Sequence, residues 1–243
     1  MSIIGLAIPT YNEKENIINL LDSIINNLAI NHQHNYIILV IDDNSPDKTA
    51  SYVEEKIAHF NSEFISLHIL NREKKEGLGK AYIAGFTELL NLGVEYIIQM
   101  DADFSHDPKY LANFINNLEK YDLIVGSRYV KDGGLDKDWP LIRKLVSTLG
   151  NVFARVVLAT QIKDLTGGFN CYSSALLKKI NYTGIASSGY GFIIELKYKA
   201  YITARSYLEF PIVFKDRQAG TSKIPLNTIY KNLLLCFKLR LNK

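Results

Sequence analysis

The stretch IIQMDADFSHDP (residues 97–108) carries a mostly apolar run directly into two acidic residues. The run predicts a buried strand, and Asp107 with Pro108 predicts the start of the next helix, because Asp caps helices and proline fits their first turn. Asp101 and Asp103 lie between these elements and are not needed as caps. In an extended segment, side chains two residues apart point to the same side, where two carboxylates repel each other unless a cation lies between them. We therefore interpret Asp101 and Asp103 as a candidate site for a divalent metal.

Apolar, β-branched runs alternate with helical patterns around this stretch. This order is typical of an α/β fold with a largely parallel sheet and helices on both faces. The strands are predicted near residues 3–9, 36–42, 65–70, 94–101 and 122–127, and the helices near residues 13–29, 47–59, 78–92 and 108–120. After residue 130 the alternation weakens into a loop, which is followed by a predicted helix over residues 141–159.

Length and composition limit the class of protein. A chain of 243 residues that is 47% hydrophobic can bury one large core, so we expect one main domain. Cys171 and Cys236 have neither disulfide nor metal-binding spacing and are interpreted as packing residues, which suits a reducing compartment. The first residues lack the features of a signal peptide, and no run approaches the roughly 20 apolar residues that cross a bilayer. An integral membrane protein is therefore not predicted.

Polar residues follow four of the predicted strands. They are Pro9 to Glu13 after the first strand, Asp42 and Asp43 after the second, Asp101 and Asp103 after the fourth, and Arg128 after the fifth. In open α/β sheets, ligands bind beyond the carboxyl ends of the strands. We therefore expect these residues to meet at one crevice.

Two of these groups also have a structural interpretation. Thr10 and Glu13 fit the capping box that opens a helix, although a helix start can equally receive a nucleotide phosphate. Ser45 and Pro46 fit the N-cap and the first residue of the next helix. Asp42 is not explained in this way, and a carboxylate at a strand end suits a hydrogen bond to a ribose hydroxyl or a base edge. We interpret Asp42 as a nucleotide contact.

The glycine-rich motifs of the commonest nucleotide folds are missing. The segment REKKEGLGKAYIAGF (residues 72–86) has Lys74 where a Walker A loop needs glycine and Ala81 where it needs Ser or Thr, and no G-x-G-x-x-G follows the first strand. ATP-binding and nicotinamide enzymes of the usual kinds are therefore disfavoured. Gly77 and Gly79 are interpreted as residues that shape a loop and a helix entry beside the nucleotide.

Cations gather in the second half of the chain. Arginine and lysine in loops that contain glycine, serine and threonine suit a phosphate group. The residues interpreted as contacts to an anionic ligand are Arg128, Arg143, Lys144, Arg217 and Lys223. Gly167 and Gly168 predict a close approach of the backbone to a ligand or to another segment. Glu195 lies in an apolar helical run, where it would orient an arginine or a sugar, or form a structural ion pair.

The end of the chain is basic. Residues 215–243 contain seven Lys or Arg residues and one acid, a net charge of +6 in a protein whose total is +3. This asymmetry favours contact with an anionic surface such as lipid headgroups, although a solvated helix has the same pattern. Residues 225–243 are typical of an amphipathic helix that lies on a membrane, and packing of the same helix on the core is the alternative.

Nine stretches together resemble the dolichol-phosphate mannose synthases, also called polyprenol monophosphomannose synthases, which are inverting family 2 glycosyltransferases of GT-A fold. The likeness covers nearly the whole chain, and the last five stretches are the more specific to the polyprenol-phosphate branch. In chain order, the stretches are IPTYNEKENI, VIDDNSPDKT, REKKEGLGKAY, MDADFSHDP, VGSRYV, WPLIRKLVS, DLTGGFNCY, SGYGFIIEL and DRQAGTSK.

The resemblance implies a role for individual residues. Nucleotide contacts fall on Pro9, Tyr11, Glu13, Asp42, Gly79 and Ala102. Metal contacts for Mg²⁺ or Mn²⁺ fall on Asp101, Asp103 and Ser105, which stands where some members have glutamine. Contacts to the acceptor phosphate and the diphosphate fall on Arg128, Arg143, Ser147, Arg217 and Lys223, and the residues expected to be catalytic are Asp101, Asp103 and Arg128.

The implied activity is transfer of mannose from GDP-mannose to a polyprenyl or dolichyl phosphate at the cytoplasmic face of a membrane. The catalytic domain would span residues 1–224 and the membrane-surface helix residues 225–243. Because a lipid phosphate is already an anion at neutral pH, no Asp, Glu or His should be needed as a general base, including His106 and Glu195.

Several alternatives stay open from the sequence. A related enzyme would use UDP-glucose or another sugar nucleotide, and a protein of a different class would bind a nucleotide without catalysis. A nucleic-acid binder is disfavoured, because it would need aromatic residues interleaved with the basic tail, and Tyr230 and Phe237 alone are thin evidence for this. The sequence does not identify any small membrane subunit that acts as a partner.

Overall fold

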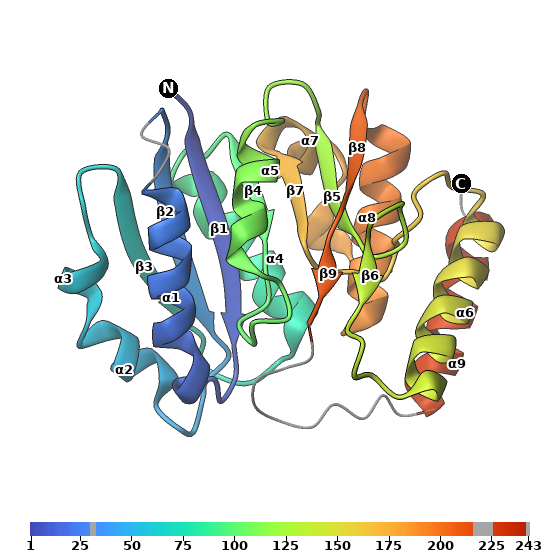
Figure 1. Cartoon of the computed structure of the whole chain (residues 1–243), viewed down its shortest axis with the longest axis horizontal. Coiled ribbons are helices and arrows are strands. Elements are labelled where there is room, and N and C mark those ends of the chain that lie inside the picture. Colours follow the sequence, from blue (N-terminus) through green and yellow to red (C-terminus); the bar gives the residue numbers. More distant parts are fainter. Residues whose placement is uncertain (30–32, 216–225, 242–243) are drawn as a thin grey trace.

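The computed structural model describes residues 1–29, 33–215 and 226–241. Seven strands form one sheet in the order β3-β2-β1-β4-β7-β5-β8, as Figure 1 shows. The strands of this sheet are β1 (Ile3–Thr10), β2 (Asn35–Asp42), β3 (Ile65–Asn71), β4 (Tyr96–Gln99), β5 (Leu123–Ser127), β7 (Asn170–Ser173) and β8 (Tyr207–Pro211). All neighbours pair in parallel except β7, which runs antiparallel to both β4 and β5. Strands β6 (Gly134–Leu135) and β9 (Val213–Phe214) form a small parallel pair beside it.

Two hydrophobic layers enclose the sheet. Successive residues of β1 alternate between them, since Leu6 and Ile8 belong to one buried cluster and Ala7 to the other. Helices α1 (Lys14–Leu28), α2 (Thr49–Glu54), α3 (Ile57–Phe60) and α5 (Leu111–Ile115) contribute side chains to the first layer. Helices α4 (Leu78–Asn91), α6 (Leu141–Leu158), α7 (Ser174–Lys179), α8 (Tyr190–Thr203) and α9 (Leu226–Leu241) contribute to the second. The α/β fold with helices on both faces is therefore confirmed.

Two of the predicted helices differ in the structure. The segment predicted over residues 47–59 is divided into α2 and α3, and α2 begins at Thr49 rather than after Ser45. Lys48 precedes it with a left-handed φ of 64°. The segment predicted over residues 108–120 starts as a short 3₁₀ turn, η1 (Pro108–Tyr110), with Asp107 as its N-cap, and α5 ends at Ile115. A second 3₁₀ turn is η2 (Tyr182–Gly184).

The two cysteines are packing residues, as predicted. Cys171 on β7 and Cys236 on α9 are both buried and have free thiols. Burial raises the pKa of each thiol, so both are poor nucleophiles. Cys236 also shows that α9 packs on the body of the protein, because it belongs to the same buried cluster as Phe192 and Leu158.

Helices α6 and α9 lie against each other at the end of the molecule that is farthest from β3 (Figure 1). Among the described residues, none of the helices has both the length and the apolar character needed to span a bilayer. The carboxyl ends of the parallel strands all point to the lower edge of the sheet in Figure 1. Asp42, the acidic residues that follow β4, and Arg128 after β5 lie at this edge.

Candidate functional site

The candidate site begins at the acidic turn after β4, residues 101–105. The strand ends at Gln99, and Phe104 has a left-handed φ of 62°, so this segment is a turn rather than extended chain. The premise that Asp101 and Asp103 share one side of a strand is therefore wrong. The side chain of Asp101 is 30% exposed, whereas Asp103 is buried and its Oδ1 accepts a hydrogen bond of 3.1 Å from the Ser105 N–H.

Two neighbours hold Asp101 in place. The Tyr82 hydroxyl donates to Asp101 Oδ1 at 2.9 Å. The Asp101 backbone N–H donates to His106 Nδ1 at 3.0 Å, and His106 Nε2 lies 4.0 Å from Asp101 Oδ2. Because Nδ1 accepts, the proton of a neutral imidazole is on Nε2 and faces the carboxylate.

His106 is a buried, neutral residue. Burial lowers its pKa, and the nearby carboxylates only partly oppose this effect. Its ring is stacked on Phe169, with the ring centroids 4.9 Å apart, and meets Phe214 edge-on. His106 thus supports the backbone and the carboxylate of Asp101.

The acidic turn suits a divalent ion completed by a ligand. Within residues 1–29, 33–215 and 226–241, no group of three or more His, Cys, Asp or Glu side chains is placed to hold a metal. Mg²⁺ is commonly bound by one or two carboxylates together with substrate phosphates, so two acids are enough when a diphosphate is present. The Ser105 hydroxyl beside Asp103 is buried, and it has no hydrogen-bond partner in the described part of the chain. This unsatisfied oxygen agrees with the predicted place of Ser105 among the metal contacts.

Asp42 at the end of β2 has a structural role that the sequence did not reveal. Its carboxylate accepts from the Thr10 hydroxyl at 2.9 Å, the Ser45 N–H at 2.8 Å and the Ser45 hydroxyl at 2.6 Å. The predicted capping box is wrong, because Thr10 lies in β1 and bonds to Asp42. Asp42 therefore joins the ends of β1 and β2, and it remains a predicted nucleotide contact.

Asp43 directly follows Asp42 at the end of β2. It pairs with Arg72 and accepts from the backbone N–H groups of Glu76 and Gly77. Gly77 has a φ of 90° and precedes α4 directly. Asp43 thus fixes the loop that leads into α4, and its place beside Asp42 was the only signal for this role in the sequence.

The other predicted nucleotide contacts lie on the same edge or pack nearby. Pro9 lies in β1 opposite Ile41, and Tyr11 follows the strand with the Lys75 ammonium 3.5 Å from its ring centroid. Glu13 precedes α1 and accepts from the Asn16 side chain. Ala102 is buried in the acidic turn.

Gly79 is required by packing of α4 on α8. A Cβ at this position would lie 3.0 Å from Phe192 side-chain atoms. The structure explains the glycine at position 79 by the close approach of two helices. Its contact with a nucleotide stays a prediction.

Arg128, a predicted contact to an anionic ligand, is buried and paired. Its Nε donates to Asp164 Oδ2 at 2.7 Å, and its Nη2 donates to Asp164 Oδ1 and to the Thr166 hydroxyl, both at 2.8 Å. Burial disfavours the charged form of both residues, but the attraction between them is the larger effect. Asp164 therefore raises the pKa of Arg128, and Arg128 lowers the pKa of Asp164. A guanidinium has five N–H donors, of which the two on Nη1 are those it can offer to an anion.

Gly167 and Gly168 lie close to other segments of the protein. This close approach was one of the two alternatives predicted for them, and approach to a ligand was the other. A Cβ on Gly167 would lie 3.1 Å from the Asp164 carboxylate. A Cβ on Gly168 would lie 3.3 Å from the His106 ring and 3.5 Å from both Asp101 carboxylate oxygens. The 164–168 loop therefore touches Arg128 at one end and the acidic turn at the other.

The remaining predicted cations are only partly described. Arg143, near the start of α6, stacks on Trp139 with its guanidinium carbon 3.6 Å from the ring centroid. The Ser147 hydroxyl is hydrogen-bonded to the Tyr129 hydroxyl at 2.8 Å. Arg217 and Lys223 lie outside the described residues.

Glu195 forms a structural ion pair. It is buried, pairs with Lys199 at 2.8 Å and accepts from the Ser187 hydroxyl at 2.7 Å. Two residues further along α8, Lys197 was missed entirely. It is completely buried and donates to the backbone carbonyls of Asp164 and Gly167, each at 2.7 Å.

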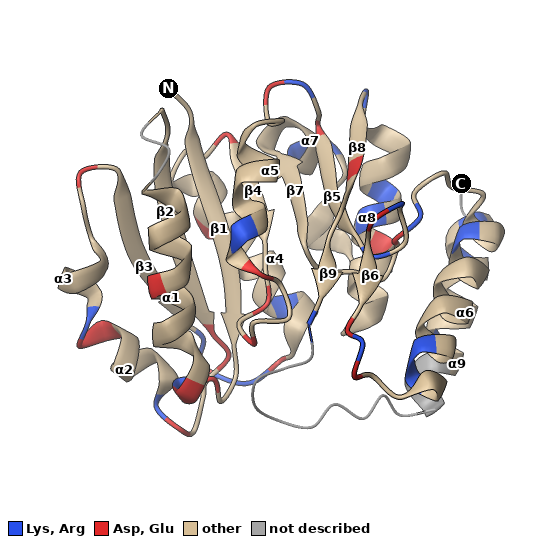
Figure 2. Cartoon of the chain, viewed as in Figure 1, with Lys and Arg blue, Asp and Glu red and all other residues tan. Residues whose placement is uncertain are grey.

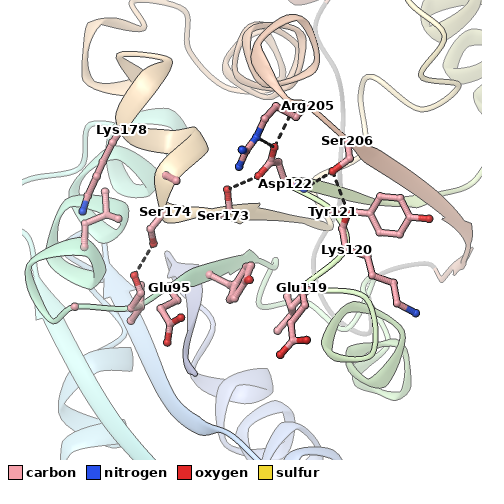
Figure 3. A pocket seen from close by; sticks show the side chains of 16 residues that line it. Glu95, Glu119, Lys120, Tyr121, Asp122, Ser173, Ser174, Lys178, Arg205 and Ser206 are labelled. Carbon is pink, nitrogen blue, oxygen red and sulfur yellow. Dashed lines mark hydrogen bonds and ion pairs between the residues drawn. The ribbon is translucent and has the colours of Figure 1, made fainter. Parts of the chain in front are cut away.

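A separate pocket lies at the opposite, amino-terminal edge of the sheet. It has a volume of about 590 Å³ and is lined by Asp122, Arg205, Ser173 and Lys178, among others (Figure 3). Asp122 accepts from Arg205 Nε at 3.4 Å and from the Ser173 hydroxyl at 3.3 Å. The predicted site residues are not among those that line this pocket.

Comparisons with known proteins show the family of the chain. A family model described as glycosyl transferase family 2 matches residues 6–180. The chain belongs to glycosyl transferase family 2. An undecaprenyl-phosphate mannosyltransferase of Micrococcus luteus is 36% identical over 217 residues, which are 89% of this chain and 85% of that protein. A polyprenol monophosphomannose synthase of Mycolicibacterium smegmatis is 37% identical over 220 residues, which are 90% of this chain and 80% of that protein.

A solved structure supports the fold of this family 2 member. Glucosyl-3-phosphoglycerate synthase from Mycobacterium tuberculosis, in complex with Mn²⁺, UDP and glucosyl-3-phosphoglycerate, superposes with a TM-score of 0.62. The match covers 99% of this chain and 79% of that chain at 17% identity, so it bears on the fold alone. The predicted GT-A fold is confirmed.

Proposed function

We propose that this family 2 protein transfers mannose from GDP-mannose to a polyprenyl phosphate with inversion, which gives polyprenyl-phosphate mannose and GDP. The observation that carries the proposal is that one short loop, residues 164–168, contacts both Arg128 and the acidic turn. In this proposal, Arg128 would bind the phosphate nucleophile and the acidic turn would hold the metal-bound diphosphate, on the two sides of this loop. The two curated relatives bear names that denote mannose transfer to polyprenyl phosphates.

The chemistry needs charge and orientation rather than a base. An oxygen of the acceptor phosphate attacks the anomeric carbon, and the bond from that carbon to the diphosphate oxygen breaks as GDP leaves. Arg128 and Arg143 would bind the anions, which otherwise repel each other. Asp103, with Asp101 and Ser105 beside it, would hold Mg²⁺ or Mn²⁺, which would neutralise the charge that develops on the leaving diphosphate.

The identity of the donor is tested by transfer from a panel of radiolabelled sugar nucleotides into a chloroform-soluble product. We expect label from GDP-mannose with undecaprenyl or dolichyl phosphate as acceptor. Label only from UDP-glucose would favour the related sugar-nucleotide enzyme. Absence of transfer from every donor would favour a nucleotide-binding protein without catalysis.

The pH–rate profile should reflect the acceptor. A phosphate monoester has a second pKa near 6, so kcat/KM is expected to fall below pH about 6 and to be flat towards pH 8. Glu195→Gln should retain the activity, since Glu195 pairs with Lys199 on its own helix. Steady-state kinetics at constant ionic strength measure both effects. A second ionisation that vanishes in Glu195→Gln would identify an essential base and contradict the proposal.

We propose that an exposed apolar face on α6 and α9 binds the membrane surface. The two helices lie side by side in Figure 1. Contiguous apolar surface of this kind marks an interaction site. Its residues are Leu141, Ile142, Leu145, Leu149 and Val156 of α6 and Leu234, Phe237 and Leu241 of α9, whose exposed fractions run from 49% to 82%. The Lys and Arg residues of α6 lie towards its two ends, which leaves its middle uncharged (Figure 2).

This face suits binding to an anionic bilayer. The side of the bilayer would be the cytoplasmic one, because sugar nucleotides are available there. Basic residues border it, including Arg143 and Lys144 on α6 and Lys238 and Arg240 on α9. Amphipathic helices with such borders lie in the headgroup region. The helix expected over residues 225–243 would act together with α6, because Cys236 packs inward while Leu234 and Phe237 stay exposed.

Substitution of both Leu141 and Leu145 by serine should weaken binding to vesicles that contain phosphatidylglycerol roughly 10-fold, because each leucine loses apolar contact with lipid. Sedimentation with vesicles measures the effect. Ile202→Ser is the matched control, since Ile202 is 45% exposed on a different helix, α8. Unchanged vesicle binding together with loss of a dimer in solution would assign the face to a second copy of the chain instead.

A further inference from the structure

The interior next to the candidate site holds an unusual cluster of charges. Asp164 and Lys197 are both 0% exposed, and Arg128 is 8% exposed. Lysine and aspartate are almost never fully buried unless they are paired. Removing these charges from water costs free energy, so we expect the cluster to have a role other than stabilising the fold.

Most of these contacts converge on one loop. The Asp164 carboxylate accepts from the Arg128 backbone N–H at 3.0 Å and from the Gly167 N–H at 2.9 Å, besides the guanidinium. Lys197 binds the carbonyls of residues 164 and 167, and among the described residues it has no hydrogen bond to a carboxylate. The Asn151 side chain bonds to the backbone of residues 163 and 165, and Glu209 accepts from the N–H groups of Lys163 and Asp164. Side chains from four other parts of the chain, Arg128, Asn151, Lys197 and Glu209, thus hold this segment in place.

The position of the loop explains why rigidity matters. Gly168 lies against the Asp101 carboxylate and the His106 ring, where a Cβ would be in contact with both. The start of the loop holds the guanidinium of Arg128 from two sides, through Asp164 and Thr166. The 164–168 loop therefore connects the surroundings of the acidic turn with those of the guanidinium and helps to fix the distance between them. A misplacement of reacting groups by 1 Å can cost about 100-fold in rate.

We propose that Asp164 and Lys197 are positioning residues for sugar transfer: Asp164 orients the Arg128 guanidinium towards the anion, and Lys197 fixes the loop that sets its distance from the acidic turn. This inference rests on the proposed function. Thr166 contributes through its hydrogen bond to Arg128 Nη2. These residues act through Arg128 and the loop and need not touch the substrate.

The test is a set of double-mutant cycles with Arg128→Lys, because lysine cannot replace the bidentate contact. Asp164→Asn and Lys197→Met should each lower kcat/KM for undecaprenyl phosphate by about 100-fold in the wild-type background. In the Arg128→Lys background, Asp164→Asn should cause little further loss. A purely structural role predicts that the two losses multiply, and that result would overturn the inference.

A milder variant covers the case in which Asp164→Asn or Lys197→Met does not fold. Thr166→Val removes one acceptor of Arg128 and keeps the ion pair. We expect an increase in KM for undecaprenyl phosphate of about 5-fold with an unchanged melting temperature and an unchanged KM for GDP-mannose. Thr87→Val is the matched control, since Thr87 makes a hydroxyl contact of 3.0 Å to Tyr182.

The outcomes separate the two proposals. A wild-type protein that transfers no sugar to undecaprenyl phosphate overturns the proposed function and the positioning roles together. An active wild-type enzyme in which Thr166→Val raises both KM values equally, or in which its effect multiplies with that of Arg128→Lys, overturns only the positioning roles.

Discussion

Replacement of Asp103 by asparagine is expected to lower kcat/KM by about 10²–10³-fold while the protein stays folded. The carboxylate is buried beside an unsatisfied Ser105 hydroxyl, and the amide removes the negative charge that a divalent ion requires. Activity should also disappear on thorough chelation and return when Mn²⁺ or Mg²⁺ is added. Radiolabelled transfer, with a melting temperature for each variant, measures both effects.

Asp122→Asn provides the matched control for this prediction. It makes the same chemical change at the opposite edge of the sheet, where Asp122 bonds to Arg205 and Ser173 (Figure 3). Its activity should stay near that of the wild type. If Asp103→Asn retained full activity, or if chelation had no effect, the metal site and the assignment of the acidic turn would both be wrong.

Replacement of Phe169 by alanine is expected to lower the free energy of unfolding by about 3–5 kcal/mol, as is usual for a buried phenylalanine. Phe169 is 0% exposed and lies between His106 and Phe114, with ring centroids 4.9 Å and 4.7 Å away. Loss of this ring leaves a cavity and removes the surface on which His106 is stacked. Urea denaturation at neutral pH measures the change.

The effect should extend from stability to activity. His106 accepts the Asp101 N–H, so a displaced imidazole would disturb the acidic turn even in molecules that stay folded. Phe237→Ala on α9 is the control, because Phe237 is 50% exposed and should cost much less. A change in free energy below about 1 kcal/mol for Phe169→Ala would contradict the packing described here.

Much of the fold could be predicted from the sequence because its signals are local. Buried strands such as β1 and β2 are continuous apolar runs, and helices such as α1 and α4 show their own periodicity. The antiparallel strand β7 was not predicted, because a strand of four residues has little periodicity of its own. Its direction depends on its partners β4 and β5, which are distant in sequence.

The same distinction applies to the site. The sequence alone determined that acidic residues, glycines and arginines fall at the ends of strands, since the order of apolar runs and polar residues is written in the chain. Only the tertiary structure decided their partners: Arg128 pairs with Asp164, Thr10 bonds to Asp42 rather than capping a helix, and Lys197 is buried under a loop 30 residues away. Such contacts depend on which segments the packed sheet brings together, and burial then makes each pairing obligatory, because an unpaired charge or donor in the interior is too costly.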